Sequence, residues 1–271
     1  MKVSVVSDIH GNIDALARIA DSVEQLVVLG DLLDYIDYHD SSGGVLGAIF
    51  GSLAVERMSQ MRSSGDFEAY HAYDRELWST VADPGAVLDD VVAARYEKIA
   101  AVLPPGTLIT LGNVDVEHVW RAIAPPELAP LDGEVVELGG VRLGFVGGGA
   151  LRKPPSDSPW KSFDRSYAEF RAALGRVGDV DVLCSHIPPK IADMRFDTLA
   201  QREEMYGPGL LAFIEARRPV LALSGHIHHP RAREAMIGPT RCVNVGYFRR
   251  RPTPFVFDTN DLHSPEDYFV A

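Results

Sequence analysis

Five short blocks of sequence, each directly after an apolar run, carry side chains that bind metal ions. The blocks are Ser7-Asp8-Ile9-His10-Gly11-Asn12, Gly30-Asp31, Gly112-Asn113-Val114-Asp115, Ser185-His186 and Gly225-His226-Ile227-His228. The ligands expected among them are two carboxylates, one amide oxygen and four imidazoles, about the number needed to hold two divalent cations with positions left for water and substrate. Because sites in α/β sheets form at the carboxyl ends of strands, the blocks predict strands whose ends converge on one site.

The apolar runs predict an α/β fold. Val3–Val6 and Leu26–Leu29 flank apolar residues at helical spacing, with Asn12 as a plausible N-cap, which predicts a β-α-β unit and a parallel strand pair. Gly139-Gly140 and Gly238-Pro239 lie between apolar runs and predict two hairpins. We expect two facing mixed sheets with helices outside. The further strands and helices expected are Thr107–Leu111, Val180–Cys184, Val220–Leu223, Phe163–Arg176 and Leu210–Arg217.

The stretch from about 35 to 105 differs from the rest of the chain. It has few strand signals, and its helical spacing runs from Ala54 through Met61 and from Ala86 to Val102. We therefore expect one domain over residues 1–271 that contains a mainly helical insertion at about 35–105. Two arrangements fit this pattern equally well: helices packed beside or over the site, or extra core helices without contact to substrate.

Composition excludes several classes of function. The net charge of −12 argues against bulk nucleic-acid binding, which needs a basic stripe; the run Arg249-Arg250-Arg251 is too short to reverse it. No apolar run approaches the roughly 18 residues that span a bilayer. Two lone cysteines favour a reducing compartment, and the N-terminus enters a strand directly, which indicates no targeting peptide. We expect a cytoplasmic protein without membrane attachment, and a homo-oligomer is compatible with the sequence.

Taken singly, most of these blocks have ordinary explanations. Asp8 and His10 fit an N-cap and a core histidine, and Asp31 fits a turn residue. The pair His226 and His228 is a stronger signal, since two imidazoles on one extended segment face the same side. All five blocks in order, each at a strand end, favour metal binding.

Together the blocks resemble the calcineurin-like metallophosphoesterases. That family's pattern of Asp-x-His, Gly-Asp, Gly-Asn-His-Asp/Glu, His and Gly-His-x-His is matched at every block, with Val114 as the one departure. The resemblance covers most of the chain outside the insertion. It implies a four-layer αββα sandwich with the site on loops along one edge of the sheets.

The resemblance also implies which residue does what. One cation would be bound by Asp8, His10 and His228, the other by Asn113, His186 and His226, with Asp31 as the bridge. A carboxylate suits a bridge because each oxygen can serve one cation. A hydroxide shared by two cations would attack the phosphorus in line. Mixed nitrogen and oxygen ligands leave Mn²⁺, Fe and Zn²⁺ open.

Other residues are expected to support this centre. We assign Asp31, Asn113 and Asp115 to catalysis, with Asp115 as the best candidate for orienting imidazoles. Asn12 and His229 are the other candidates, and each of the three could equally be an ordinary loop residue.

Val114 bears on the substrate. In much of the family a histidine there assists the leaving oxygen, and general acid help is worth about 10²–10⁴-fold. The bacterial phosphodiesterases with Gly-Asn-Cys-Asp also lack it, and this chain resembles them. Another histidine could substitute, although a surface or core role is the better reading for each. The candidates are His39, His71 and His118, the last ranked lowest.

We therefore predict a metal-dependent hydrolase that acts on a small phosphodiester, nucleotide-like or of the glycerophospho type. Asn113 and Arg152 are the expected substrate-binding residues, although Arg152 could be a solvated charge. The alternatives are a phosphomonoesterase or a dinucleoside polyphosphate hydrolase. A non-catalytic scaffold is disfavoured because every expected ligand is present.

Overall fold

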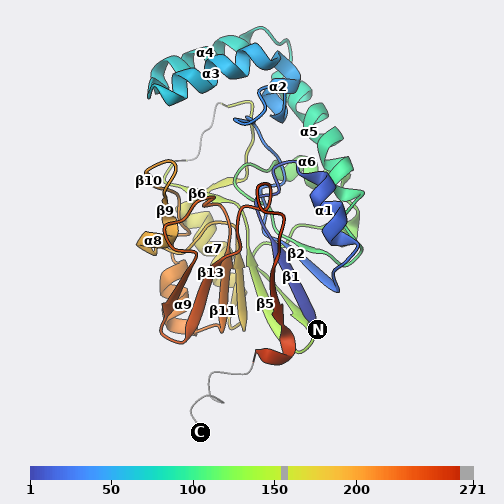
Figure 1. The fold of residues 1–271 in the computed structure, drawn as a ribbon, viewed down its shortest axis with the longest axis vertical. Coiled ribbons are helices and arrows are strands. Elements are labelled where there is room, and N and C mark those ends of the chain that lie inside the picture. Colours follow the sequence, from blue (N-terminus) through green and yellow to red (C-terminus); the bar gives the residue numbers. More distant parts are fainter. Residues whose placement is uncertain (154–157, 263–271) are drawn as a thin grey trace.

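The computed structural model describes residues 1–153 and 158–262, which form a mixed α/β fold around two large sheets (Figure 1). The first sheet has the order β14-β1-β2-β3. Its strands are β1 (Lys2–Val6), β2 (Gln25–Val28), β3 (Leu108–Ile109) and β14 (Phe255–Asp258), of which only β14 is antiparallel to its neighbour. Helix α1 (Ile13–Ala20) connects β1 to β2, and Asn12 caps it by accepting a bond from the Ala15 amide. The predicted β-α-β unit is confirmed.

The second sheet has the order β12-β13-β11-β8-β5-β4. Four parallel strands form its centre: β13 (Thr240–Asn244), β11 (Leu221–Ser224), β8 (Val182–Ser185) and β5 (Val141–Val146). The antiparallel edge strands are β12 (Glu234–Ile237) and β4 (Glu134–Leu138). Gly139-Gly140 joins β4 to β5, and Gly238-Pro239 joins β12 to β13. Both predicted hairpins are confirmed.

Three buried clusters hold the layers together. Side chains alternate along a strand, so Val27 of β2 faces a cluster that includes Phe145 of β5, whereas Val28 faces a cluster that includes Leu16 of α1. The two sheets therefore share one apolar interior. A third cluster joins the second sheet to α7 (Tyr167–Val177) and α9 (Leu210–Arg217), for example through Phe170 and Ile214.

The region between β2 and β3 is helical, as expected. It contains α2 (Gly44–Phe50), α3 (Ser52–Ser63), α4 (Phe67–Ser79) and α5 (Pro84–Ala100). Helix α5 is a core helix, because Val92 and Tyr96 are buried in the same cluster as α6 (Glu117–Ile123). Helices α3 and α4 form an arm that projects beyond the strand ends and extends over the loops at the top of Figure 1. Which of these helices contact substrate stays a prediction.

The remaining elements lie near the strand ends. They are β6 (Gly149–Leu151), β7 (Asp164–Ser166), α8 (Ala192–Arg195), β9 (Phe196–Asp197), β10 (Arg202–Glu203) and two short 3₁₀ turns at Pro126–Leu128 and Thr259–Asp261. The helix expected from Phe163 begins only at Tyr167, because residues 164–166 pair with β6 and Ser166 forms a capping box with Glu169. In the described part of the chain, no helix is long and apolar enough to cross a bilayer.

Candidate metal centre

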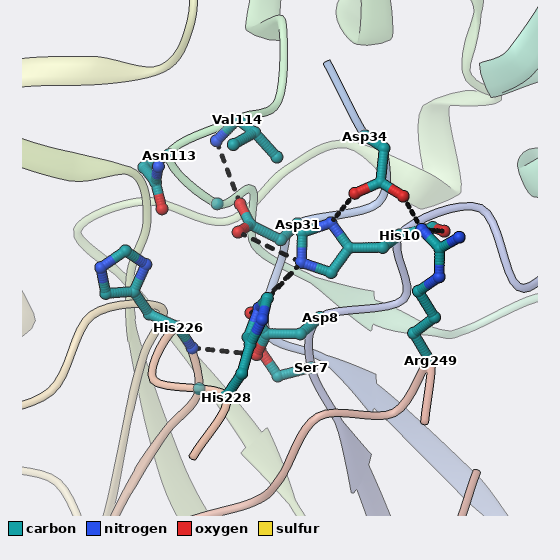
Figure 2. Close-up of polar contacts among 12 residues, drawn as sticks. Ser7, Asp8, His10, Asp31, Asp34, Asn113, Val114, His226, His228 and Arg249 are labelled. Atoms are coloured by element: carbon teal, nitrogen blue, oxygen red, sulfur yellow. Dashed lines mark hydrogen bonds and ion pairs between the residues drawn. The ribbon is translucent and has the colours of Figure 1, made fainter. Parts of the chain in front are cut away.

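The carboxyl ends of five strands bring the expected ligands to one edge of the two sheets. Side chains from two loops after distant strands, His226 and His228 on one and Asp8 and His10 on the other, face one another in Figure 2. The ligand residues form two groups, and within each group the ligand atoms all lie within 4.8 Å of one another. The first group is Asp8, His10 and His228, and the second is Asp31, His186 and His226.

The backbone at this edge is held in an uncommon conformation. Among the described residues, six that are not glycine have positive φ, and four of them are Asp8 (59°), His10 (44°), Asp31 (52°) and His226 (65°). A non-glycine residue in this region costs about 1–2 kcal/mol. Such strain persists only where the surrounding structure enforces it, and it concentrates at functional sites.

Glycines allow the ligand loops to touch. Gly30 has a φ of 90°, and a Cβ there would collide with the backbone of Gly112. A Cβ on Gly225 would collide with the side chains of Ser7 and Asp8. Only residues without a side chain let these loops approach so closely. The glycine that precedes each of these ligands is therefore part of the site's construction.

The first group is compact. His228 Nε2 lies 3.1 Å from His10 Nε2 and 3.2 Å from Asp8 Oδ1. The other Asp8 oxygen accepts a bond from the His226 amide at 2.9 Å. One carboxylate thus fixes the loop that follows β11 and still offers an oxygen to the two imidazoles.

The second group adjoins the first through Asp31. Its Oδ1 lies 3.3 Å from His186 Nε2, and its Oδ2 lies 3.8 Å from His10 Nε2. Asn113 Oδ1 lies 3.0 Å from the same His186 nitrogen. Each oxygen of Asp31 therefore faces a different group, which is the placement that a bridging carboxylate requires.

The electrostatic field at this edge is negative. Burial alone would lower the pKa of His10 and of His186, but the carboxylates of Asp8 and Asp31 outweigh it and raise each to about 9. Burial would raise the pKa of Asp8, yet its contacts with His10 and His228 hold the pKa well below the usual value. Strongly ionised carboxylates that stabilise positive charge on their neighbours would attract cations equally.

One buried nitrogen shows how the centre fits a metal. His226 Nε2 is buried and has no hydrogen-bond partner among the described residues. Burial, followed by the charge of His186, lowers the pKa of His226 to about 4, so its ring is neutral at physiological pH. A neutral imidazole with an unused nitrogen beside ionised carboxylates is the donor set that divalent transition-metal ions take. The residues present therefore fit two cations.

An ion-pair network orients the His10 ring through its Nδ1 atom, on the side opposite the ligand atom Nε2. His10 Nδ1 lies 2.8 Å from Asp34 Oδ1 and 2.9 Å from the carbonyl oxygen of Leu33. Arg249 pairs with both Asp34 and Asp37 (Figure 2 shows the Asp34 pair). The sequence did not reveal this network. Its only signal was Asp34 three residues after Asp31, and nothing in the sequence connected Asp34 with Arg249.

Asp115 has a different partner from the one expected. Its Oδ1 accepts the Leu32 amide at 2.9 Å, and its Oδ2 accepts the Gly112 amide at 2.8 Å. Tyr96 Oη also donates to Asp115, at 3.3 Å. The carboxyl therefore joins two ligand loops through their backbones, and no imidazole contact to it is found among the described residues. Burial raises its pKa to about 7.

Of the other expected residues, Val114 lies at the centre and the rest lie on the exposed surface. Val114 donates its amide to Asp31 Oδ1 at 3.0 Å and lines the cleft described below. His118 lies outside, paired with Asp89 at 3.0 Å, while His71 is exposed on α4. Arg152 is exposed at the end of β6 and is not among the cleft residues. Its role in substrate binding stays a prediction.

Within the described residues, Asn12 and His229 also have partners other than imidazoles. Asn12 caps α1 and donates its side-chain amide to the Arg249 carbonyl oxygen at 3.0 Å. The His229 ring contacts Asp197 at 3.9 Å and is about half exposed. The contacts on the imidazole Nδ1 atoms are instead made by Asp34 and by backbone carbonyls, including Leu29 on His186 at 2.7 Å.

A cleft of about 970 Å³ opens over the two groups. Its floor includes His10, Asn113, His226 and His228. The arm contributes one side, through residues of α3 and α4. Such a volume is at the upper end of the roughly 300–1,000 Å³ that pockets for small organic ligands occupy. The cleft is therefore much larger than a phosphate group alone requires.

Solved structures share this architecture at low sequence identity. One crystal structure is 14% identical over 91% of each chain, with a TM-score of 0.56. The crystal structure of TT1561 of Thermus thermophilus is 12% identical, over 95% of this chain and 98% of that one, with a TM-score of 0.54. A structure described as a novel archaeal phosphodiesterase is 12% identical over 97% and 96%, with a TM-score of 0.42. The first two likenesses concern the fold alone, and the third is too weak to carry an argument.

No curated protein matches the chain. The family model of the calcineurin-like phosphoesterases, in contrast, matches residues 1–230. That range contains every ligand of both groups. The chain therefore belongs to the calcineurin-like phosphoesterase family.

Proposed function

We propose that this phosphoesterase uses two divalent cations to hydrolyse a small phosphodiester. The observation that carries the proposal is the pair of ligand groups joined by Asp31 at the floor of a cleft, with Val114 beside them. Mn²⁺, Fe and Zn²⁺ are all compatible with these donors. The ligands expected for one cation are Asp8, His10, Asp31 and His228, and for the other Asp31, Asn113, His186 and His226. We place the protein in the cytoplasm, with a small-molecule substrate.

When bound, two such cations supply a nucleophile from water and neutralise the phosphoryl oxygens. The chain's own residues determine how the site is held. The Val114 amide fixes one oxygen of Asp31, and Asp34 sets the His10 ring so that Nε2 faces the centre. The Asn113 amide oxygen lies at the floor, 3.0 Å from His186 Nε2. These contacts preorganise the donors, which is the main contribution a protein makes to metal-assisted hydrolysis.

The side chain of Val114 favours diesters. It lines the cleft next to Asn113 and has no proton to give to a departing oxygen. General acid help is worth about 10²–10⁴-fold and matters most for poor leaving groups. The absence of an acid at this position is shared with the Gly-Asn-Cys-Asp phosphodiesterases that the sequence resembles, which favours a diester over a monoester.

The test is hydrolysis of an activated aryl phosphodiester by protein loaded with Mn²⁺. Asp31→Asn removes the shared carboxylate charge and should lower kcat/KM by about 10³-fold, the effect of several kcal/mol of lost charge stabilisation. Asp21→Asn makes the same chemical change at the exposed end of α1 and should leave the rate unchanged.

A faster reaction with an aryl monoester in the same buffer would contradict the diesterase assignment and favour the phosphomonoesterase. If the loaded protein hydrolysed neither ester and Asp31→Asn changed nothing, the enzymatic proposal itself would be wrong.

A further inference from the structure

Exposed large hydrophobic side chains line the cleft on the arm and on two neighbouring loops. Seven large hydrophobic residues of the described chain are exposed, and Tyr38 (46%), Phe67 (48%) and Leu199 (74%) all line this cleft. Phe67 begins α4, Tyr38 precedes α2, and Leu199 lies between β9 and β10. Exposed apolar side chains gathered at a cleft indicate a binding surface.

Arg62 adds a flat cationic group to these rings. Its Nη1 donates to Tyr38 Oη at 2.7 Å, and its guanidinium carbon lies 4.8 Å from the centre of the Tyr38 ring. Both side chains are exposed and line the cleft. A guanidinium held beside an aromatic ring presents a planar surface on which another flat, polarisable group can stack.

We infer that the arm, together with Tyr38 of the loop before α2, binds a nucleobase, so that the substrate is a nucleotide phosphodiester whose phosphate lies over the metal centre. The inference rests on the proposed phosphodiesterase activity and adds the chemical class of the group attached to the phosphate. The rings of Tyr38 and Phe67 stack against the base, and Arg62 supplies charge to its face or to a second phosphate. Aromatic side chains stack on every base without requiring a particular sequence.

The polar residues of the arm favour a nucleobase over an alkyl chain as the bound group. The cleft residues of the arm include Ser59, Ser63 and Arg62 next to Tyr38 and Phe67. An acyl chain would bury these polar groups without partners, which is unfavourable. A nucleobase has two apolar faces and a rim of donors and acceptors, so it satisfies rings and hydroxyls together. The volume of about 970 Å³ also exceeds the need of a glycerol-sized group.

The experiment compares two diesters that share a 4-nitrophenyl leaving group and differ in the other group: one carries adenosine and the other carries glycerol. Hydrolysis by the Mn²⁺-loaded protein is followed by chromatography. We expect Phe67→Leu and Tyr38→Leu each to lower kcat/KM for the adenosine diester by about tenfold, the loss that removal of one stacking ring causes. The glycerol diester should be cleaved at the same rate by all variants.

Matched variants isolate the aromatic ring. Phe67→Tyr and Tyr38→Phe keep a ring and should retain the wild-type preference. Leu53→Ala removes an apolar side chain that is 79% exposed on α3 but absent from the cleft, and should change neither rate. Because Tyr38 and Phe67 are about half exposed, their replacement should leave the unfolding transition unchanged.

Binding provides a readout that does not require turnover. Titration calorimetry with adenosine 5′-monophosphate and with glycerol 3-phosphate should show about tenfold weaker binding of the nucleotide alone to Phe67→Leu. Equal losses for both ligands, or unchanged nucleotide binding, would overturn the inference. An octyl 4-nitrophenyl phosphodiester preferred over the adenosine diester would overturn it in favour of a lipid. Failure of the activity itself is recognised separately, since the activated aryl diester would then not react.

Discussion

The strand-end loops and the arm formed by α3 and α4 are built in opposite ways. The loops at the strand ends have little conformational freedom. They contain residues in the left-handed region, glycines in close contact with neighbouring loops, and buried carboxylates that accept hydrogen bonds from the backbone. The arm contacts solvent over much of its surface, and its cleft-lining residues Arg62 and Phe67 are exposed, as is Tyr38 on the loop before α2. Under the proposed function, the chemistry that needs fixed atoms lies on the rigid part. Selection among substrates would then lie on a part where side chains can change without disturbing the core.

The largest expected contrast concerns one glycine in each region. Gly30 and Gly51 have φ of 90° and 80°, but a Cβ has no room at Gly30 and meets nothing within 4 Å at Gly51. We expect Gly30→Ala to lower the free energy of unfolding by about 3 kcal/mol or more, because steric overlap adds to backbone strain. Gly51→Ala should cost about 1–2 kcal/mol. Urea unfolding of metal-free protein measures both, and equal losses would mean that the ligand loops are not tightly packed.

The next contrast concerns two aspartates. Asp34→Asn removes the charge between His10 and Arg249 and should weaken metal binding or activity by about 10–100-fold, as loss of a group that orients a ligand does. Asp74→Asn alters a carboxyl on α4 that contacts Tyr35 Oη at 3.4 Å, and should leave metal binding unchanged. Competition with a chelating dye measures the affinities. Unchanged affinity in both variants would show that Asp34 does not position His10.

The smallest effect is expected at His118. Its ring pairs with Asp89 on the exposed surface, so His118→Asn should change stability by no more than about 0.5 kcal/mol and leave kcat/KM unaltered. His39→Asn is the comparison, since His39 lines the cleft and contacts Arg250 Nη2 at 3.2 Å. Activity is measured with the aryl diester. A tenfold loss in His118→Asn alone would contradict the placement of His118 on the surface and of His39, not His118, at the cleft.

The sequence predicted the rigid region well because local patterns determine it. An apolar run followed by glycine and a ligand specifies a strand end, and parallel strands bring such ends to one edge. Leu210–Arg217 forms the helix expected there, and Gly139-Gly140 forms its hairpin. The ligand atoms expected from the blocks do converge.

Contacts between distant segments were not predictable in the same way. The pairing of Asp34 with Arg249 depends on how β14 returns beside β1, and no periodicity reports that path. The carboxyl of Asp115 was expected on an imidazole, but the close approach of Gly112 and Gly30 places backbone amides nearer to it. Helical spacing indicated the arm without showing what its exposed face contacts, because amphipathicity identifies a buried face and not its partner.

The left-handed residues have a consequence for how such a centre is inherited. Asp8, His10, Asp31 and His226 occupy positions where glycine would relieve strain, so a lineage that no longer used metals would gain stability by replacing them. This chain carries an expected ligand at all four of these unfavourable positions. Placing the same side chains on another scaffold would fail for the same reason, since that scaffold would also have to hold its backbone in the left-handed conformation at these positions.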